Sequence, residues 1–158
     1  MKILIPTLLI STLLFGVAAA QDAPKMHAKQ SNLDRQGLAI KGYDPVAYFT
    51  ADKAEEGKKD IALTVDGVTY LFATPHNLEL FKSNPGKYQP QYGGWCAYAM
   101  GATGEKVDID PGTFKIVDGK LYLFYNQLFN NTKKSWNKDE KNLQARADLN
   151  WQKFISGH

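Results

Sequence analysis

The segment Ile61-Ala62-Leu63-Thr64-Val65-Asp66-Gly67-Val68-Thr69-Tyr70-Leu71-Phe72-Ala73-Thr74-Pro75 predicts a β-hairpin followed at once by a helix. β-branched and aromatic residues favour strands on both sides of Asp66-Gly67, and Asp-Gly suits a two-residue hairpin turn because both turn positions need positive φ. Thr74 then occupies the N-cap position of a helix, and Pro75 lies in its first turn. The helix is expected to end before Asn84-Pro85-Gly86.

A second hairpin is predicted downstream, where residues 114–117 and 121–125 flank Asp118-Gly119. From about residue 126 to 154, apolar residues recur at roughly helical spacing, and Asn130-Asn131 divides this region into two helical pieces. These elements predict an α+β domain. It would have a small antiparallel sheet built from the two hairpins, helices packed on one side, and a long C-terminal helix.

The N-terminus has the pattern of a cleavable secretion signal. Lys2 gives a positive start, residues 3–17 are mostly apolar, and Ala18-Ala19-Ala20 supplies the small residues of a cleavage site. The apolar run is short for a bilayer-spanning helix, which needs about 20 residues, and a retained N-terminal anchor is the alternative. We therefore expect a signal peptide at 1–20, a flexible leader at 21–37 and one domain at 38–156. The protein would be periplasmic or secreted, without stable membrane insertion after cleavage.

The net charge is small and not concentrated. The chain has 19 basic and 16 acidic residues, for a formal charge of +3, and its adjacent basic pairs are Lys58-Lys59 and Lys133-Lys134. Scattered basic residues argue against nucleic acid or a membrane surface as a partner. The expected partner is a metal ion or a small ligand, and the oligomeric state is left open.

Several motifs resemble the YHS domain. They are Asp44-Pro45-Val46, the Gly-x-x-Tyr-x-Phe pattern of residues 67–72, Phe81, and Asn84-Pro85-Gly86-Lys87-Tyr88, and they cover roughly residues 42–88. The rest of the chain looks like the extension seen in secreted YHS-domain proteins. The resemblance bears on the fold and leaves the function open.

The chain departs from the family at the metal-binding positions. Metal-associated YHS domains carry one cysteine after Asp-Pro-Val, one after the hairpin Phe, and one four residues further on. Here those positions hold Ala47, Ala73 and Asn77. The resemblance therefore does not transfer the family's thiolate site to this chain.

Cys96 is the only cysteine, so it forms no disulfide within the chain. Its apolar neighbours favour burial, whereas Gly93-Gly94 before it favours an exposed turn. Residues 96–100 fit either a strand or a helical turn. A helical turn would put the sulfurs of Cys96 and Met100 on one face, and His76 could add an imidazole. Such ligands suit a soft metal, so copper at Cys96, Met100 and His76 is the metal-binding hypothesis.

Two other hypotheses stay open. In the first, Cys96 is structural and a cleft lined by Tyr and Trp side chains binds a small organic ligand or a partner protein. In the second, Cys96 is the nucleophile of a thiol enzyme with His76 as its base, which requires the two side chains to be close. The sequence contains no Ser-His-Asp set, phosphate loop or nucleotide fingerprint, so we favour a binding module over an enzyme.

Overall fold

Both predicted hairpins are present in the computed structural model, which describes residues 28–156. The first consists of β1 (Lys58–Val65) and β2 (Val68–Phe72), and the second of β3 (Asp110–Val117) and β4 (Lys120–Phe124). The turn residues Asp66 and Gly67 have φ values of 51° and 80°, and Asp118 and Gly119 have 50° and 70°. The positive φ expected from each Asp-Gly pair is therefore confirmed.

The helices confirm the α+β class and the long C-terminal helix. They are α1 (Ala47–Thr50), α2 (Pro75–Ser83), α3 (Pro85–Tyr88), α4 (Ala97–Ala102), α5 (Thr132–Trp136) and α6 (Glu140–Ser156), with short 3-10 turns η1 (Ala28–Gln30), η2 (Ile40–Gly42) and η3 (Gln91–Gly94). The Thr74 hydroxyl caps α2 by accepting a hydrogen bond from the Asn77 N–H at 3.1 Å, and Pro75 lies in the first turn, as predicted. Between residues 28 and 156, no helix has both the length and the apolar character needed to cross a membrane.

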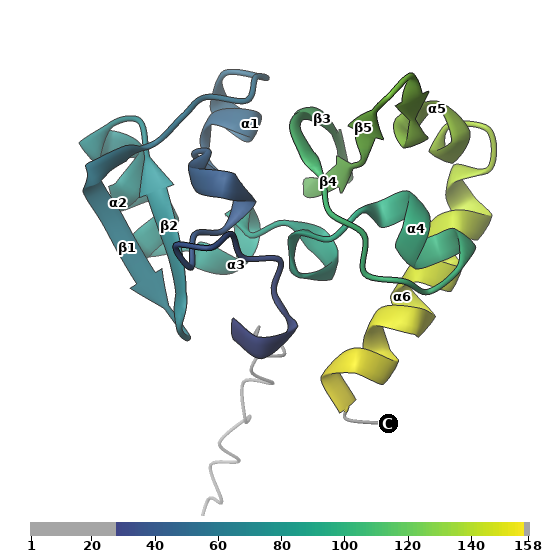
Figure 1. Cartoon of the computed structure of the whole chain (residues 1–158). Coiled ribbons are helices and arrows are strands. Elements are labelled where there is room, and N and C mark those ends of the chain that lie inside the picture. The colour runs from purple at the N-terminus through teal and green to yellow at the C-terminus, as the bar shows by residue number, and fades with distance from the viewer. Residues whose placement is uncertain (1–27, 157–158) are drawn as a thin grey trace, which may run out of the picture.

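The two hairpins belong to two copies of one structural unit, offset by 52 residues along the chain. Strands β3 and β4 start at residues 110 and 120, and β1 and β2 start at 58 and 68. An isolated parallel bridge joins Leu38 to Thr69, and another joins Pro90 to Leu121 at the same offset. We call residues 38–88 the first repeat and residues 90–156 the second repeat. Figure 1 shows the first repeat on the left and the second on the right.

The repeats share an unusual backbone conformation. Residues 40–42 have φ values of 50°, 53° and 83°, and residues 92–94, 52 positions later, have 55°, 62° and 84°. Two residues after each kink, a backbone N–H reaches an equivalent carbonyl: Asp44 donates to Glu55 at 2.8 Å, and Cys96 donates to Val107 at 2.9 Å. The repetition therefore extends to individual hydrogen bonds.

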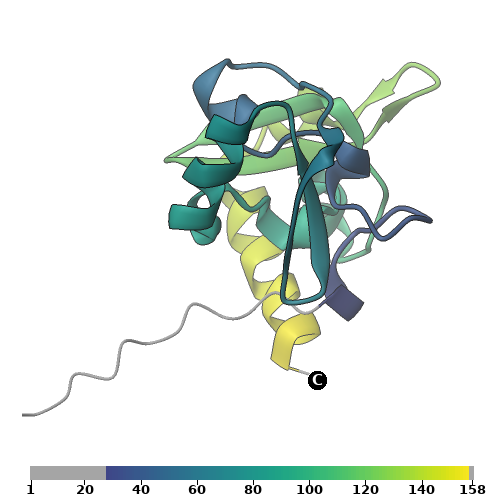
Figure 2. The same ribbon diagram turned by 90° about the vertical axis from the view of Figure 1, so that its left-hand side faces the viewer.

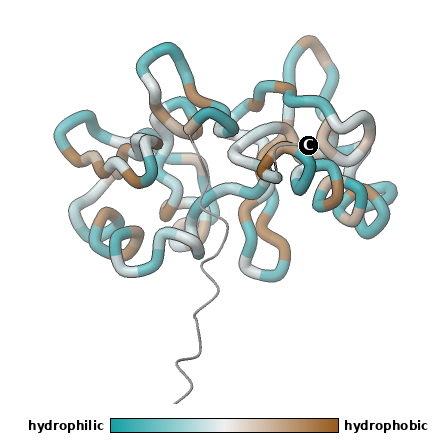
Figure 3. The backbone as a smooth tube through the Cα atoms, turned by 90° about the horizontal axis from the view of Figure 1, so that it is seen from below, coloured by the Kyte–Doolittle hydropathy of each residue, from teal (hydrophilic) through white to brown (hydrophobic). Residues whose placement is uncertain are grey.

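The hairpins form separate two-stranded sheets, not the single sheet that the sequence suggested. Strand β4 is buried on both faces. Leu121 and Leu123 enter the core that contains Tyr48, whereas Tyr122 and Phe124 enter a second core around Trp136. The hairpins thus meet through side chains and not edge to edge. Figure 3 shows apolar stretches in both repeats, separated by hydrophilic loops.

One local prediction differs from the structure, and one open choice is resolved by it. Residues 126–131 form a small hairpin, β5 (Asn126–Gln127) and β6 (Asn130–Asn131), and not helix, because Leu128 is 88% exposed and does not lie on a core-facing helix stripe. The short helix α1 begins at Ala47, after a turn at Pro45 and Val46. Helix α4 occupies residues 97–102, so the open choice between strand and helix at 96–100 resolves to an N-cap followed by a helix.

The segment before Leu38, which we expected to belong to a flexible leader, packs on the second repeat from residue 28 onward. The Trp95 indole N–H donates to the Gln30 carbonyl at 2.7 Å, and the Asn32 backbone N–H donates to the Gly93 carbonyl at 2.8 Å. The expected signal peptide at 1–20 and the start of the leader lie outside the described residues.

Candidate functional site

Asp44 forms a buried hydrogen-bonding centre in the first repeat. Its side chain has no exposed surface, and its carboxylate accepts hydrogen bonds from the Val46 N–H at 2.8 Å, the Ala73 N–H at 2.8 Å and the Asn77 amide at 2.7 Å. These donors come from the Asp-Pro turn, the end of β2 and the first turn of α2. A carboxylate satisfied by several N–H groups is a stable way to bury charge, so Asp44 fixes the junction of these elements.

Cys96 occupies the equivalent centre of the second repeat. It is fully buried at the N-cap of α4, and its sulfur accepts a hydrogen bond from the Tyr125 N–H at 3.4 Å, just as Asp44 accepts one from Ala73. The sulfur also lies 3.4 Å from the Thr132 hydroxyl, which donates to the Tyr125 carbonyl at 2.9 Å. Because the threonine proton is used in that bond, the thiol donates to the threonine oxygen. Cys96 is therefore part of a closed ring of hydrogen bonds inside the protein.

The positions that hold cysteines in metal-associated YHS domains lie together around Asp44. The backbone N–H groups of Ala47 and Ala73 and the side-chain amide of Asn77 all donate to its carboxylate. A carboxylate and its donors thus occupy the region that the resemblance assigns to a thiolate site.

The three proposed metal ligands differ in exposure and in the clusters to which they belong. His76 is exposed on α2 of the first repeat, next to the Asn77 that contacts Asp44. Cys96 and Met100 are both buried, but they belong to different hydrophobic clusters. Across the part of the chain that the structure describes, no group of three or more His, Cys, Asp or Glu side chains could hold a metal ion. Copper binding through Cys96 stays a prediction, as does a Cys96–His76 thiol enzyme, and neither gains support from this geometry.

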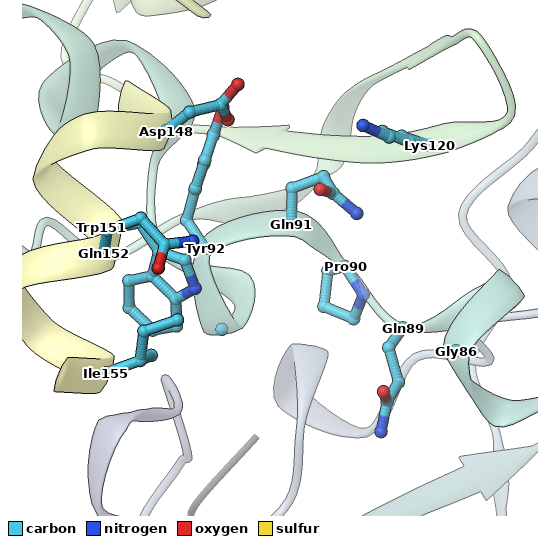
Figure 4. Close-up of a pocket in the computed structure, with 11 residues that line it drawn as sticks. Gly86, Gln89, Pro90, Gln91, Tyr92, Lys120, Asp148, Trp151, Gln152 and Ile155 are labelled. Carbon is cyan, nitrogen blue, oxygen red and sulfur yellow. The ribbon is translucent and has the colours of Figure 1, made fainter. Parts of the chain in front are cut away.

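A cleft of about 590 Å³ opens between the connection of the two repeats and the C-terminal helix. It is drawn in Figure 4. Its lining comes from α3 and the following segment, from η3, from the start of β4, and from one face of α6: Gly86, Gln89, Pro90, Gln91, Tyr92, Gly93, Lys120, Asp148, Trp151, Gln152 and Ile155. The cleft therefore depends on the junction between the repeats and on the long helix of the second repeat.

Tyr92 links the wall of the cleft to the core of the second repeat. The residue is buried in the left-handed kink, with φ of 55°, and its hydroxyl donates to Asp148 Oδ1 at 2.8 Å. Burial, followed by the hydrogen bond to Asp148 and the charge of that carboxylate, raises the pKa of Tyr92 far above its ordinary value. The phenol is thus a neutral donor that holds Asp148 at the edge of the cleft.

The cleft combines an apolar wall with two charged groups. Trp151, Pro90 and Ile155 supply apolar surface, and the lining also contains the side chains of Gln89, Gln91 and Gln152. Figure 4 shows Asp148 and Lys120 toward opposite ends of the upper edge in this view. Neither makes an ion pair with any other residue between 28 and 156. The cleft therefore offers one anion and one cation that remain open to a ligand.

Close packing fixes the position of Trp151. A Cβ atom on Gly93 would lie 2.8 Å from the Trp151 ring and 3.2 Å from the Gln30 carbonyl, and the φ of 62° at this position also favours glycine. Glycine at 93 therefore lets the indole lie against the kinked backbone.

A second hollow, of about 330 Å³, lies near the N-terminal segment and is lined by Asn32, Leu33, Asp34, Arg35, Lys41 and Asp108. Lys41 pairs with Asp108 at 2.8 Å, and the Asn32 amide donates to the same carboxylate at 3.1 Å. Burial opposes ionisation of Asp108, but these hydrogen bonds outweigh it and lower the pKa of that carboxyl. Lys41 and Asp108 pair with each other, and Asp34 accepts hydrogen bonds from the backbone of Gln36 and Leu38, so this hollow is the weaker candidate.

From the sequence we expected Tyr and Trp side chains in a cleft, but not the contributions of α6 and Lys120. A usable signal was present, because positions 148, 151, 152 and 155 fall on one helix face. Their partner surface could not be read from the sequence, since Tyr92 and Asp148 are 56 residues apart. Comparisons of the chain with protein-family models, curated proteins and solved structures give no match. The YHS resemblance thus rests on the motifs quoted above.

Proposed function

We propose that this chain is an exported binding module of the YHS type whose cleft holds a small zwitterionic molecule with an apolar body. In this proposal Cys96 is structural, and the ligand lies between Trp151 and Pro90. Its amino group faces Asp148 and its acidic group faces Lys120. The ligand class is therefore that of an amino acid or a comparably small zwitterion.

The observation that carries the proposal is the pairing of unmatched charges with an aromatic wall. Ligand sites are commonly concave and largely apolar, with a few polar groups that fix orientation. Asp148 uses one oxygen to accept from Tyr92, which holds the carboxylate in place without neutralising it. Lys120 is exposed at the start of β4 and supplies the opposite charge.

Isothermal titration calorimetry with L-phenylalanine, phenethylamine and 3-phenylpropionate tests this function. L-phenylalanine carries both charges, and each analogue carries one. We expect each analogue to bind about tenfold more weakly, because a hydrogen bond to a charged group contributes about 1.5–3 kcal/mol. Absence of binding by all three compounds would refute a zwitterion site.

Charge variants assign the contacts. Asp148→Asn should weaken the binding of phenethylamine and leave the affinity for 3-phenylpropionate unchanged. Lys120→Gln should weaken the binding of 3-phenylpropionate and leave the affinity for phenethylamine unchanged. Glu79→Gln, an exposed acid on α2 outside the cleft, is the matched control. Equal binding by all variants would place the ligand elsewhere.

A further inference from the structure

The β5–β6 hairpin is an addition to the second repeat that the first repeat does without. In the first repeat, the N-cap residue Thr74 follows the last strand residue, Phe72, after one intervening residue. In the second repeat, the chain runs from Phe124 to the N-cap residue Asn131 through six intervening residues. Residues 126–130 are the extra ones. Since the first repeat closes without them, the hairpin has a purpose other than completing the fold.

The tip of this hairpin is apolar, exposed and conformationally costly. Leu128 is 88% exposed and Phe129 is fully exposed. Both have positive φ, 50° and 66°, at the turn positions where the other two hairpins carry Asp-Gly. Bulky side chains disfavour this region of φ, and exposing them to water is also unfavourable. No contact among residues 28–156 recovers either cost, which points to a contact beyond these residues.

The base of the hairpin is held firmly. The Asn126 amide donates to the Thr113 hydroxyl at 3.0 Å, and the Thr132 N–H donates to the Tyr125 carbonyl at 3.0 Å. Figure 2 shows the hairpin projecting from the body of the protein at the upper right. The apolar tip is therefore presented outward on an anchored support.

The segment around the tip is basic. Residues 126–138 contain three lysines and no acidic residue. Lys134 and Lys138 are exposed, and neither forms an ion pair with a described residue. The acids that follow are already engaged, because Asp139 pairs with Arg146 and Glu140 pairs with Lys115. The segment that carries the tip thus has a net positive charge, which favours an anionic partner.

We propose that the β5–β6 hairpin docks the protein reversibly on an anionic lipid surface. Leu128 and Phe129 enter the boundary between headgroups and acyl chains, and Lys134 and Lys138 contact the headgroup phosphates. An anionic bilayer supplies an apolar layer beneath a charged one, which matches an apolar tip followed by lysines. Lysine acts as a point charge without the fixed geometry of arginine, which suits a diffuse anionic surface. Although basic residues are scattered over the whole chain, the segment that carries the tip therefore has a local positive charge.

Vesicle co-sedimentation of the purified protein tests the proposal. We expect binding to phosphatidylcholine vesicles that contain phosphatidylglycerol, and much weaker binding to phosphatidylcholine alone. Replacing both tip residues, Leu128→Ser with Phe129→Ser, should lower the partition coefficient about tenfold or more. Lys134→Gln and Lys138→Gln should each lower it about fivefold, and added salt should act in the same direction.

Two controls make the result decisive. Lys58→Gln with Lys59→Gln removes an exposed basic pair from β1 and should leave binding unchanged. Deleting residues 126–130 restores the short connection of the first repeat, so the variant should fold, as judged by its urea transition, and lose vesicle binding. The proposal is overturned if the unaltered protein does not bind anionic vesicles. It is also overturned if the tip variant or the deletion variant binds them as strongly as the unaltered protein.

Discussion

The two repeats have the same arrangement of hairpin and helices but different buried hydrogen-bonding side chains at their centres. Asp44 and Cys96 lie 52 positions apart, and each receives the N–H of the residue that follows the last strand of its hairpin. The first centre is a carboxylate with short hydrogen bonds from three segments, whereas the second is a thiol with two longer contacts. The comparison shows that both repeats place a hydrogen-bonding side chain at this position, a carboxylate in the first and a thiol in the second.

The repeats also differ where helices pack. Phe49 in the first repeat corresponds to Gly101 in the second. Phe49 contacts the Tyr88 ring with a centroid distance of 5.4 Å, whereas Gly101 lies directly against the backbone of α6 at Leu143. Loss of the side chain lets the long helix approach α4, and the same helix supplies Asp148 and Trp151 to the cleft. The asymmetry between the repeats is therefore what creates the candidate site.

The largest expected effect is at the first centre. Asp44→Ala should destabilise the protein by about 3 kcal/mol or more, because it leaves several buried N–H groups without an acceptor. Cys96→Ala should cost about 1–2 kcal/mol, since a thiol is a weaker partner. Urea denaturation measures both values, with Asp118→Asn in an exposed turn as the control. Equal losses at Asp44 and Cys96 would contradict the proposed difference between the centres.

A smaller effect is expected where α4 crosses α6. In Gly101→Ala, the added Cβ would lie 2.4 Å from the Leu143 carbonyl oxygen, so the helices must move apart, at a cost of about 1–3 kcal/mol. Gly86→Ala is the matched control, because its Cβ would meet only the Asn84 side chain at 4.0 Å. If thermal unfolding shows the same stability for both variants, the close approach of the helices is not a constraint.

The sequence predicted what local chemistry determines. The Asp-Gly turns, the Thr74 cap and the end of α2 all follow from neighbouring residues, and all are present. A signal for the repeat was also there, because Val-Asp-Gly-x-x-Tyr-Leu-Phe occurs at residues 65–72 and again at 117–124. The cleft could not be predicted, since it forms where α6 returns to the junction of the repeats. The helix prediction for residues 126–131 was wrong because Leu128 matches the apolar spacing of a helix and yet faces solvent.

The smallest effect concerns alkaline pH and the aromatic cluster of the second repeat. Burial, followed by the nearby charge of Asp148, raises the pKa of Tyr122 from its ordinary 10.0 to about 12. A raised pKa in the folded state means that the stabilising contribution is complete below pH 10.0 and is lost as the pH rises toward about 12. In Tyr122→Phe, stability should fall less over this range, as measured by urea midpoints at several pH values. An identical decline in both proteins would show that Tyr122 ionisation is not linked to folding.

The accessibility of Cys96 separates a structural centre from a metal ligand or nucleophile. Alkylation of the native protein, followed over increasing urea, measures it directly. The account predicts slow labelling whose rate rises with urea in proportion to global unfolding, because the thiol is closed within its hydrogen-bonded ring. Rapid labelling in the absence of urea, with little dependence on urea, would contradict a structural role and favour copper binding through Cys96.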